Sequence, residues 1–171
     1  SEVIIGREYL KAEEWWKKNV GENIRAVALN LFGGEDKTKG VFGLSHAIEF
    51  IDNIAKTISN DKKILILLNN NASEVKEALL GHYKGSNRIV FMPEASPGDN
   101  GIKAIVAKSD LVITVEGGMM HLATALNVNC LTLYSARHID WPFSSDSASG
   151  NADHWFTEGS VLLRQSYFIL K

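Results

Sequence analysis

Five short runs of apolar residues recur along the chain, and each run is nearly continuous rather than alternating with polar positions. They occupy residues 25–29, 64–68, 88–92, 111–115 and 131–134. Continuous apolar strands are expected where helices cover both faces of a sheet, as in parallel α/β sheets. The pattern therefore predicts a parallel sheet that is buried on both sides.

The segments between these runs have the periodicity of amphipathic helices, with apolar residues recurring at i, i+3 and i+4. Ser73 can cap one of these helices, and the segment 93–101 is rich in turn residues. The helices are expected over residues 7–20, 45–59, 73–83, 102–108 and 118–126.

Strand and helix thus alternate four times before the fifth strand. A sixth strand is expected around residues 161–163, after the Ser-, Asp- and Gly-rich loop 135–157. This order predicts an α/β fold, a Rossmann-like doubly wound parallel sheet of about five to six strands with helices on both faces. Right-handed crossovers would place the carboxyl ends of the strands on one edge, where ligands bind.

Length and net charge limit the number of domains and the classes of ligand that are expected. A chain of 171 residues fits one domain. A net charge of −2 provides no general attraction for nucleic acid or an anionic membrane, so any anion site must be local. No run of 18 apolar residues predicts a transmembrane helix. The single cysteine, Cys130, cannot form an internal disulfide and is interpreted as a small buried hydrophobic residue.

Two segments at predicted strand ends carry polar residues that could contact a ligand. Residues 33–40 combine glycines with Lys37 and Lys39, which could contact phosphate, although the loop matches neither the Walker A nor the G-x-G-x-x-G motif. Glu74 follows three asparagines after the second strand and could face a ribose or base. Taken alone, each segment is more typical of a solvated turn.

The third candidate is the turn before the helix expected at residues 118–126. A helix N-terminus has free N–H groups and a partial positive charge, which suits a phosphate. Gly117 and Gly118 would let this backbone approach the ligand. The candidate residues here are Glu116, Gly117, Gly118, Met119, Met120 and His121. A glycine turn of this kind also occurs for purely structural reasons.

The remaining histidines have no metal-ligand spacing with each other or with the cysteine, so neither a metal site nor a bound cofactor is expected. These histidines are His46, His82, His138 and His154.

Residues 108–135 read KSDLVITVEGGMMHLATALNVNCLTLYS and resemble the donor-binding motif of glycosyltransferase family 9. That family comprises lipopolysaccharide heptosyltransferases, which use ADP-heptose on a GT-B fold. Its motif has an acidic strand entry, then D-[ST]-G-x-x-H-L-A-x-A-L, then a short strand ending in an aromatic residue. The matching residues are Asp110, Gly118, His121, Leu122, Ala123, Ala125 and Leu126.

Weaker similarities extend the resemblance over residues 26–143. The loop 33–40 lies where the family has a phosphate-contacting lysine, which either Lys37 or Lys39 could represent, and Glu74 lies near a family acid that contacts the nucleoside. Two residues depart from the motif. Glu116 stands where the family has aspartate, and Gly117 stands where it has serine or threonine.

The resemblance implies one half of a two-domain enzyme. The chain opens on Ser1 rather than Met, and its length holds one Rossmann-like unit. We therefore expect residues 1–22 to be a lead-in helix from an N-terminal acceptor domain that is missing here, and residues 23–171 to be the donor-binding domain. The catalytic base would lie in that missing domain, so no catalytic residue is expected in this chain, which alone should bind nucleotide weakly and transfer nothing.

The implied function is a role in an inverting, metal-independent transfer of heptose from ADP-heptose to a lipopolysaccharide core or related glycan. The expected partners are a nucleotide diphosphate sugar and a glycan or lipid-linked acceptor, with no nucleic acid. The expected location is the cytoplasm or the inner face of the bacterial inner membrane. Two alternatives stay open, a non-catalytic nucleotide-sugar-binding module and an unrelated flavodoxin-like or sugar-epimerase domain.

Overall fold

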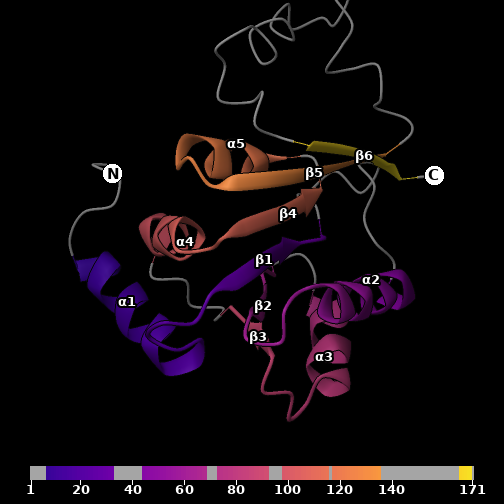
Figure 1. Ribbon diagram of the computed structural model, residues 1–171, viewed down its shortest axis with the longest axis horizontal. Coiled ribbons are helices and arrows are strands. Elements are labelled where there is room, and N and C mark those ends of the chain that lie inside the picture. Colours follow the sequence, from indigo (N-terminus) through magenta and orange to yellow (C-terminus); the bar gives the residue numbers. More distant parts are fainter. Residues whose placement is uncertain are drawn as a thin grey trace, which may run out of the picture.

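The computed structural model describes residues 7–32, 44–68, 73–92, 98–115, 117–135 and 166–170 (Figure 1). The helices are α1 (Arg7–Asn19), α2 (Leu44–Thr57), α3 (Ser73–His82), α4 (Gly98–Ala107) and α5 (Gly118–Ala125). The strands are β1 (Ala26–Asn30), β2 (Lys63–Ile66), β3 (Ile89–Phe91), β4 (Leu111–Val115), β5 (Asn129–Ser135) and β6 (Ser166–Leu170).

The strands form one parallel sheet in the order β3-β2-β1-β4-β5-β6. The chain moves outward from β1 to β3, and then returns to place β4 on the other side of β1. The carboxyl ends of β1 and β4 therefore meet at the topological switch point of a doubly wound sheet. This confirms the predicted Rossmann-like fold class.

Helices cover both faces of the sheet, with α2 and α3 on one side and α1, α4 and α5 on the other (Figure 1). Alternate residues of a strand pack against the helices of opposite layers, because successive side chains of a strand point in opposite directions. Val27 and Leu29 of β1 pack in the α2/α3 layer, whereas Ala26 and Ala28 pack in the other layer. Burial on both faces explains why the strands read as continuous apolar runs.

Helix α1 is packed into this second layer. Its residues Ala12 and Trp16 are almost fully buried with Val20 and residues of α4. At its outer side, Lys108 pairs with Glu13 at 2.6 Å and lies 5.7 Å from the centre of the Trp16 ring. The helix expected at residues 7–20 is confirmed. Its origin in a preceding domain stays a prediction.

Two expected boundaries differ from the structure. The segment 93–101 was expected to be a turn, but α4 begins within it, at Gly98. The glycines and polar residues at this end are poor helix formers, but burial of Gly101, Ala104 and Ile105 outweighs that preference. The last strand lies at Ser166–Leu170, whereas the expected residues 161–163 fall outside the described residues. Cys130 is buried as expected, and burial raises the pKa of its thiol.

Candidate functional site

The turn between β4 and α5 lies at the carboxyl edge of the sheet, beside the switch point. Gly117 has φ +148° and ψ −165°, a conformation that L side chains rarely adopt. Glycine at this position allows β4 to pass into α5 within two residues of Val115, the last residue of the strand. The sequence thus puts a helix N-terminus next to the end of β1.

The first turn of α5 retains backbone N–H donors. The N-cap residue Gly117 has no side chain to cap the helix, and the N–H of Met120 donates to the Gly117 carbonyl at 3.1 Å. The amides of Gly118 and Met119 are therefore the best placed to serve a ligand. No described atom lies within 4 Å of where a Cβ would stand at Gly117 or Gly118. Among the described residues, the space beside the turn is open.

The side chains of this first turn differ in exposure. His121 is exposed, Met119 is half-buried, and Met120 is buried in the interior. The Met120 side chain therefore holds the helix to the core. His121 is the one of these three side chains that is displayed to solvent at the positive end of α5, where an anion would be stabilised.

The other candidate residues are described only in part. Lys37, Lys39 and Glu116 lie outside the described residues. Glu74 is the second residue of α3, which follows the carboxyl end of β2 at the same edge of the sheet, and its side chain is not described. The grouping of these residues around one ligand stays a prediction.

Two polar residues at the switch point were missed from the sequence. The Asn30 Nδ2 atom donates a 2.9 Å hydrogen bond to Thr114 Oγ1, joining the carboxyl ends of β1 and β4. Thr114 is completely buried and Asn30 is half-buried. The signal was a polar residue at the end of one apolar strand and next to the end of another, but pairing these strands requires the sheet order.

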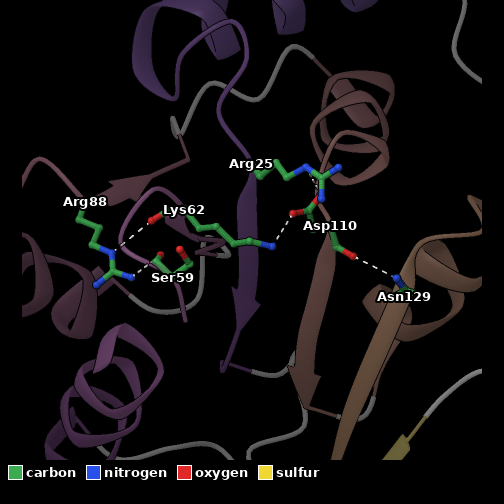
Figure 2. Close-up of polar contacts among 6 residues, drawn as sticks. All are labelled: Arg25, Ser59, Lys62, Arg88, Asp110 and Asn129. Carbon is green, nitrogen blue, oxygen red and sulfur yellow. Dashed lines mark hydrogen bonds and ion pairs between the residues drawn. The ribbon is translucent and has the colours of Figure 1, made fainter. Parts of the chain in front are cut away.

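A pocket of about 610 Å³ lies at the opposite, amino-terminal edge of the sheet. Arg25, Lys62, Asp110 and Asn129 line it (Figure 2). The Asp110 carboxylate pairs with Lys62 at 3.0 Å and Arg25 at 3.7 Å, and the Asp110 carbonyl accepts from Asn129 at 3.3 Å. Asp110, the acidic strand entry of the resemblance, therefore links the starts of neighbouring strands and lies away from the turn at Gly117.

Arg88, beside this pocket, also makes structural hydrogen bonds. Its guanidinium donates to the carbonyls of Ala55, Ile58, Ser59 and Lys62, as Figure 2 shows for the last two. The bonds to Ala55, Ile58 and Ser59 satisfy carbonyls in and just after the last turn of α2, where intrahelical partners run out, and the bond to Lys62 reaches the start of β2. The charges at this edge are used to hold α2 and the strand starts together, so the carboxyl edge is the better candidate site.

Within the described part of the chain, no three His, Cys, Asp or Glu side chains converge as metal ligands. No helix there is long and apolar enough to cross a membrane.

The chain is similar in structure to solved glycosyltransferases. The structure of E. coli ADP-heptose lps heptosyltransferase II matches with a TM-score of 0.64 and 13% identity over 98% of this chain and 44% of that chain. A glycosyl transferase family 9 protein from Veillonella parvula matches with a TM-score of 0.65 and 13% identity over 98% and 41%. E. coli heptosyltransferase WaaC with ADP matches with a TM-score of 0.59 and 16% identity over 94% and 42%.

At these identities the similarity shows the fold, and the chain spans less than half the length of each of these proteins. No curated protein sequence matches the chain. The family model described as "Glycosyltransferase family 9 (heptosyltransferase)" matches residues 52–153, which is more than half of the chain and includes the β4–α5 turn. The chain therefore belongs to glycosyltransferase family 9.

Proposed function

We propose that this chain is the donor-binding half of an inverting glycosyltransferase that transfers heptose from ADP-heptose to a lipopolysaccharide core or a related glycan. The observation that carries the proposal is the exposed N-terminus of α5, whose N-cap is a glycine without a capping side chain and which lies at the switch point of the sheet. Two solved structures of one relative, E. coli heptosyltransferase WaaC, support ADP-heptose as the donor, since one is with ADP and the other with ADP-2-deoxy-2-fluoro heptose.

The proposed domain division follows the same resemblance. Residues 1–22 lead in from an N-terminal acceptor-binding half, and residues 23–171 form the donor-binding domain. The reacting sugar lies between the two halves, so this chain alone binds nucleotide weakly and transfers no sugar. The acceptor is a glycan or lipid-linked glycan, and the reaction takes place in the cytoplasm or at the inner face of the bacterial inner membrane.

The proposed reaction is a single displacement. A base in the other half removes the proton from an acceptor hydroxyl, whose oxygen attacks the anomeric carbon of the sugar. The bond between this carbon and the diphosphate oxygen breaks, and its electron pair leaves with the nucleotide diphosphate. Attack from the side opposite the leaving group inverts the configuration at the anomeric carbon.

The task of this chain is to stabilise the negative charge that develops on the leaving diphosphate. The amides of Gly118 and Met119 are donors at the positive end of α5, and such preorganised donors are effective where charge develops. The exposed His121 adds a further donor in the same turn. Lys37 or Lys39 would add a positive charge from the loop that follows β1.

Two acids would recognise hydroxyl groups of the donor. Glu116 precedes the turn and would accept from the sugar or ribose, and Glu74 would accept from the ribose. Glu116 is one methylene longer than the aspartate of the family motif, so its reach toward the sugar differs. Gly117 provides no hydroxyl, so the diphosphate contact at this position depends on the backbone.

The two departures from the motif favour one alternative, a nucleotide-sugar-binding module without transferase activity. In that case the turn would still bind the diphosphate, because its backbone donors do not depend on Glu116 or on a hydroxyl at Gly117. Membership of family 9 argues against the other alternative, an unrelated flavodoxin-like or sugar-epimerase domain.

The test of the proposal is calorimetric titration of ADP, UDP and GDP into the chain and into two histidine variants. ADP should bind with the highest affinity, and His121→Ala should weaken it roughly tenfold, as expected for loss of one hydrogen bond to a charged group. His82→Ala is the matched control, because His82 is also exposed but ends α3 at the opposite edge of the sheet. It should leave ADP affinity unchanged.

Three results would count against parts of this proposal. If none of the three nucleotides binds at millimolar concentration, the donor-binding function fails. If UDP binds and ADP does not, the family assignment stands and ADP-heptose is excluded as the donor. If both histidine variants lose affinity equally, the site is not at the first turn of α5.

A further inference from the structure

The switch point contains a hydrogen-bonded link that the proposed function does not yet use. Asn30 and Thr114 are register partners on β1 and β4, the two strands whose carboxyl ends meet there. The Thr114 hydroxyl donates to the Val115 carbonyl at 2.7 Å. Since a hydroxyl has one hydrogen, it must accept from the Asn30 amide at 2.9 Å. The bonds thus run in one direction, from β1 to the last residue of β4.

This link lies at the base of both segments that should hold the diphosphate. Gly33, which opens the expected lysine loop, is three residues beyond Asn30, and Gly117 is two residues beyond Val115. The link fixes the last carbonyl of β4, from which the chain turns into α5. It also joins Asn30, the last residue of β1, to the end of β4.

The neighbouring positions on the same face of the sheet indicate a role beyond packing. Two residues earlier on each strand, Ala28, Val112 and Cys130 form a buried row that is apolar apart from the thiol. At the carboxyl edge the row becomes polar, with Thr132 of β5 next to Thr114. Thr114 and Thr132 are both completely buried. If this row served only packing, apolar residues would suffice at the positions of Thr114 and Thr132. A buried hydroxyl is costly unless it is hydrogen-bonded.

We propose that Asn30 and Thr114 are positioning residues for the diphosphate-binding turn, an inference that rests on the proposed function. The Asn30–Thr114–Val115 link holds the end of β4, from which α5 begins, against the end of β1. Neither residue needs to touch the ligand. Their effect on binding passes through the position of the Gly118 and Met119 amides.

The first test is calorimetric titration of ADP into Thr114 variants. Thr114→Val keeps the shape and removes the hydroxyl, and it should raise the ADP Kd about tenfold, the lower end of what residues that orient a binding site contribute. Thr114→Ser keeps the hydroxyl and should stay within about twofold of the wild type. The matched control is Val112→Ala, two residues earlier on the same strand and the same face, and completely buried. It should lower the Tm without changing the ADP Kd.

The second test uses Asn30→Leu, which keeps the test decisive if a Thr114 variant does not fold. This variant should also raise the ADP Kd about tenfold, and the double variant should lose no more than either single one, because both act through one bond. Wild-type affinity in Asn30→Leu or Thr114→Val overturns the inference, and so does an equal loss in Val112→Ala. If the wild type itself binds no nucleotide diphosphate, the proposed function fails and this inference fails with it.

Discussion

At the scale of single residues, the clearest feature is the glycine at position 117. The family resemblance leads one to expect serine or threonine there, and the structure gives a physical reason for glycine in this chain. The backbone of Gly117 has φ +148°, where a side chain is strained whatever space is available. Loss of the hydroxyl therefore comes together with a tight turn that places the N-terminus of α5 directly after β4.

Restoring the hydroxyl should reveal this strain. Gly117→Ser should lower the free energy of unfolding by about 1–3 kcal/mol, the cost of holding a non-glycine residue in such a conformation. Urea denaturation followed by circular dichroism measures the effect. Gly118→Ser is the matched control, because that position is equally open but has no positive φ, and it should change stability by less than about 0.5 kcal/mol. Equal stability of the two variants would contradict the strain argument.

At the scale of secondary structure elements, the contact between α1 and α4 makes the N-terminal helix part of the folded unit. Trp16 is buried in the interface, and Glu13 and Lys108 form an ion pair across it. The hydrogen bond from Lys108 holds the pKa of the Glu13 carboxyl below its usual value, against the opposing effect of burial. The folded state therefore favours the ionised form of Glu13.

This pKa shift predicts a loss of stability in acid. Because the folded-state pKa of Glu13 is the lower one, its contribution is complete above the unfolded value near 4.5 and is lost as pH falls through the folded value. Glu13→Gln should lower stability at neutral pH by less than about 1 kcal/mol, since the pair is partly exposed. The difference from the wild type should begin to shrink as pH falls through about 4.5 and should disappear only below the lower, folded-state pKa.

Urea denaturation of both proteins between pH 7 and pH 3 measures this difference. The control is Glu14→Gln, which removes an exposed carboxylate of the same helix and leaves the Glu13–Lys108 pair in place. A difference between Glu13→Gln and the wild type that stayed constant over the whole range would show that the pair does not couple α1 to α4.

The elements themselves could largely be predicted from the sequence. Strands β1 to β5 and helices α1, α2, α3 and α5 lie within a few residues of their predicted positions. Burial of both faces makes the strands continuously apolar, and burial of one face gives the helices apolar residues at i, i+3 and i+4. The start of α4 could not be predicted, since Gly98 and Gly101 favour a turn and only packing stabilises the helix there. The Asn30–Thr114 bond was also missed, because these residues are distant in sequence and meet only in the sheet.

At the scale of the whole molecule, the two edges of the sheet have different uses. The amino-terminal edge has a pocket, but its Arg25, Lys62 and Asp110 are bound to one another. The carboxyl edge presents the start of α5 and carries the family motif. The chain spans less than half the length of the solved heptosyltransferases. Sugar transfer by the whole protein is therefore our proposal, and it rests on donor binding at the carboxyl edge.

The most direct test of this account is an NMR titration of the isotope-labelled chain with ADP, which reports each backbone amide separately. The account predicts that the largest shifts occur at the Gly118 and Met119 amides, with little change at Lys62 and Asn129 of the opposite edge. Shifts confined to the amino-terminal pocket, or no shifts at millimolar ADP, would contradict the claim that the N-terminus of α5 binds the donor diphosphate.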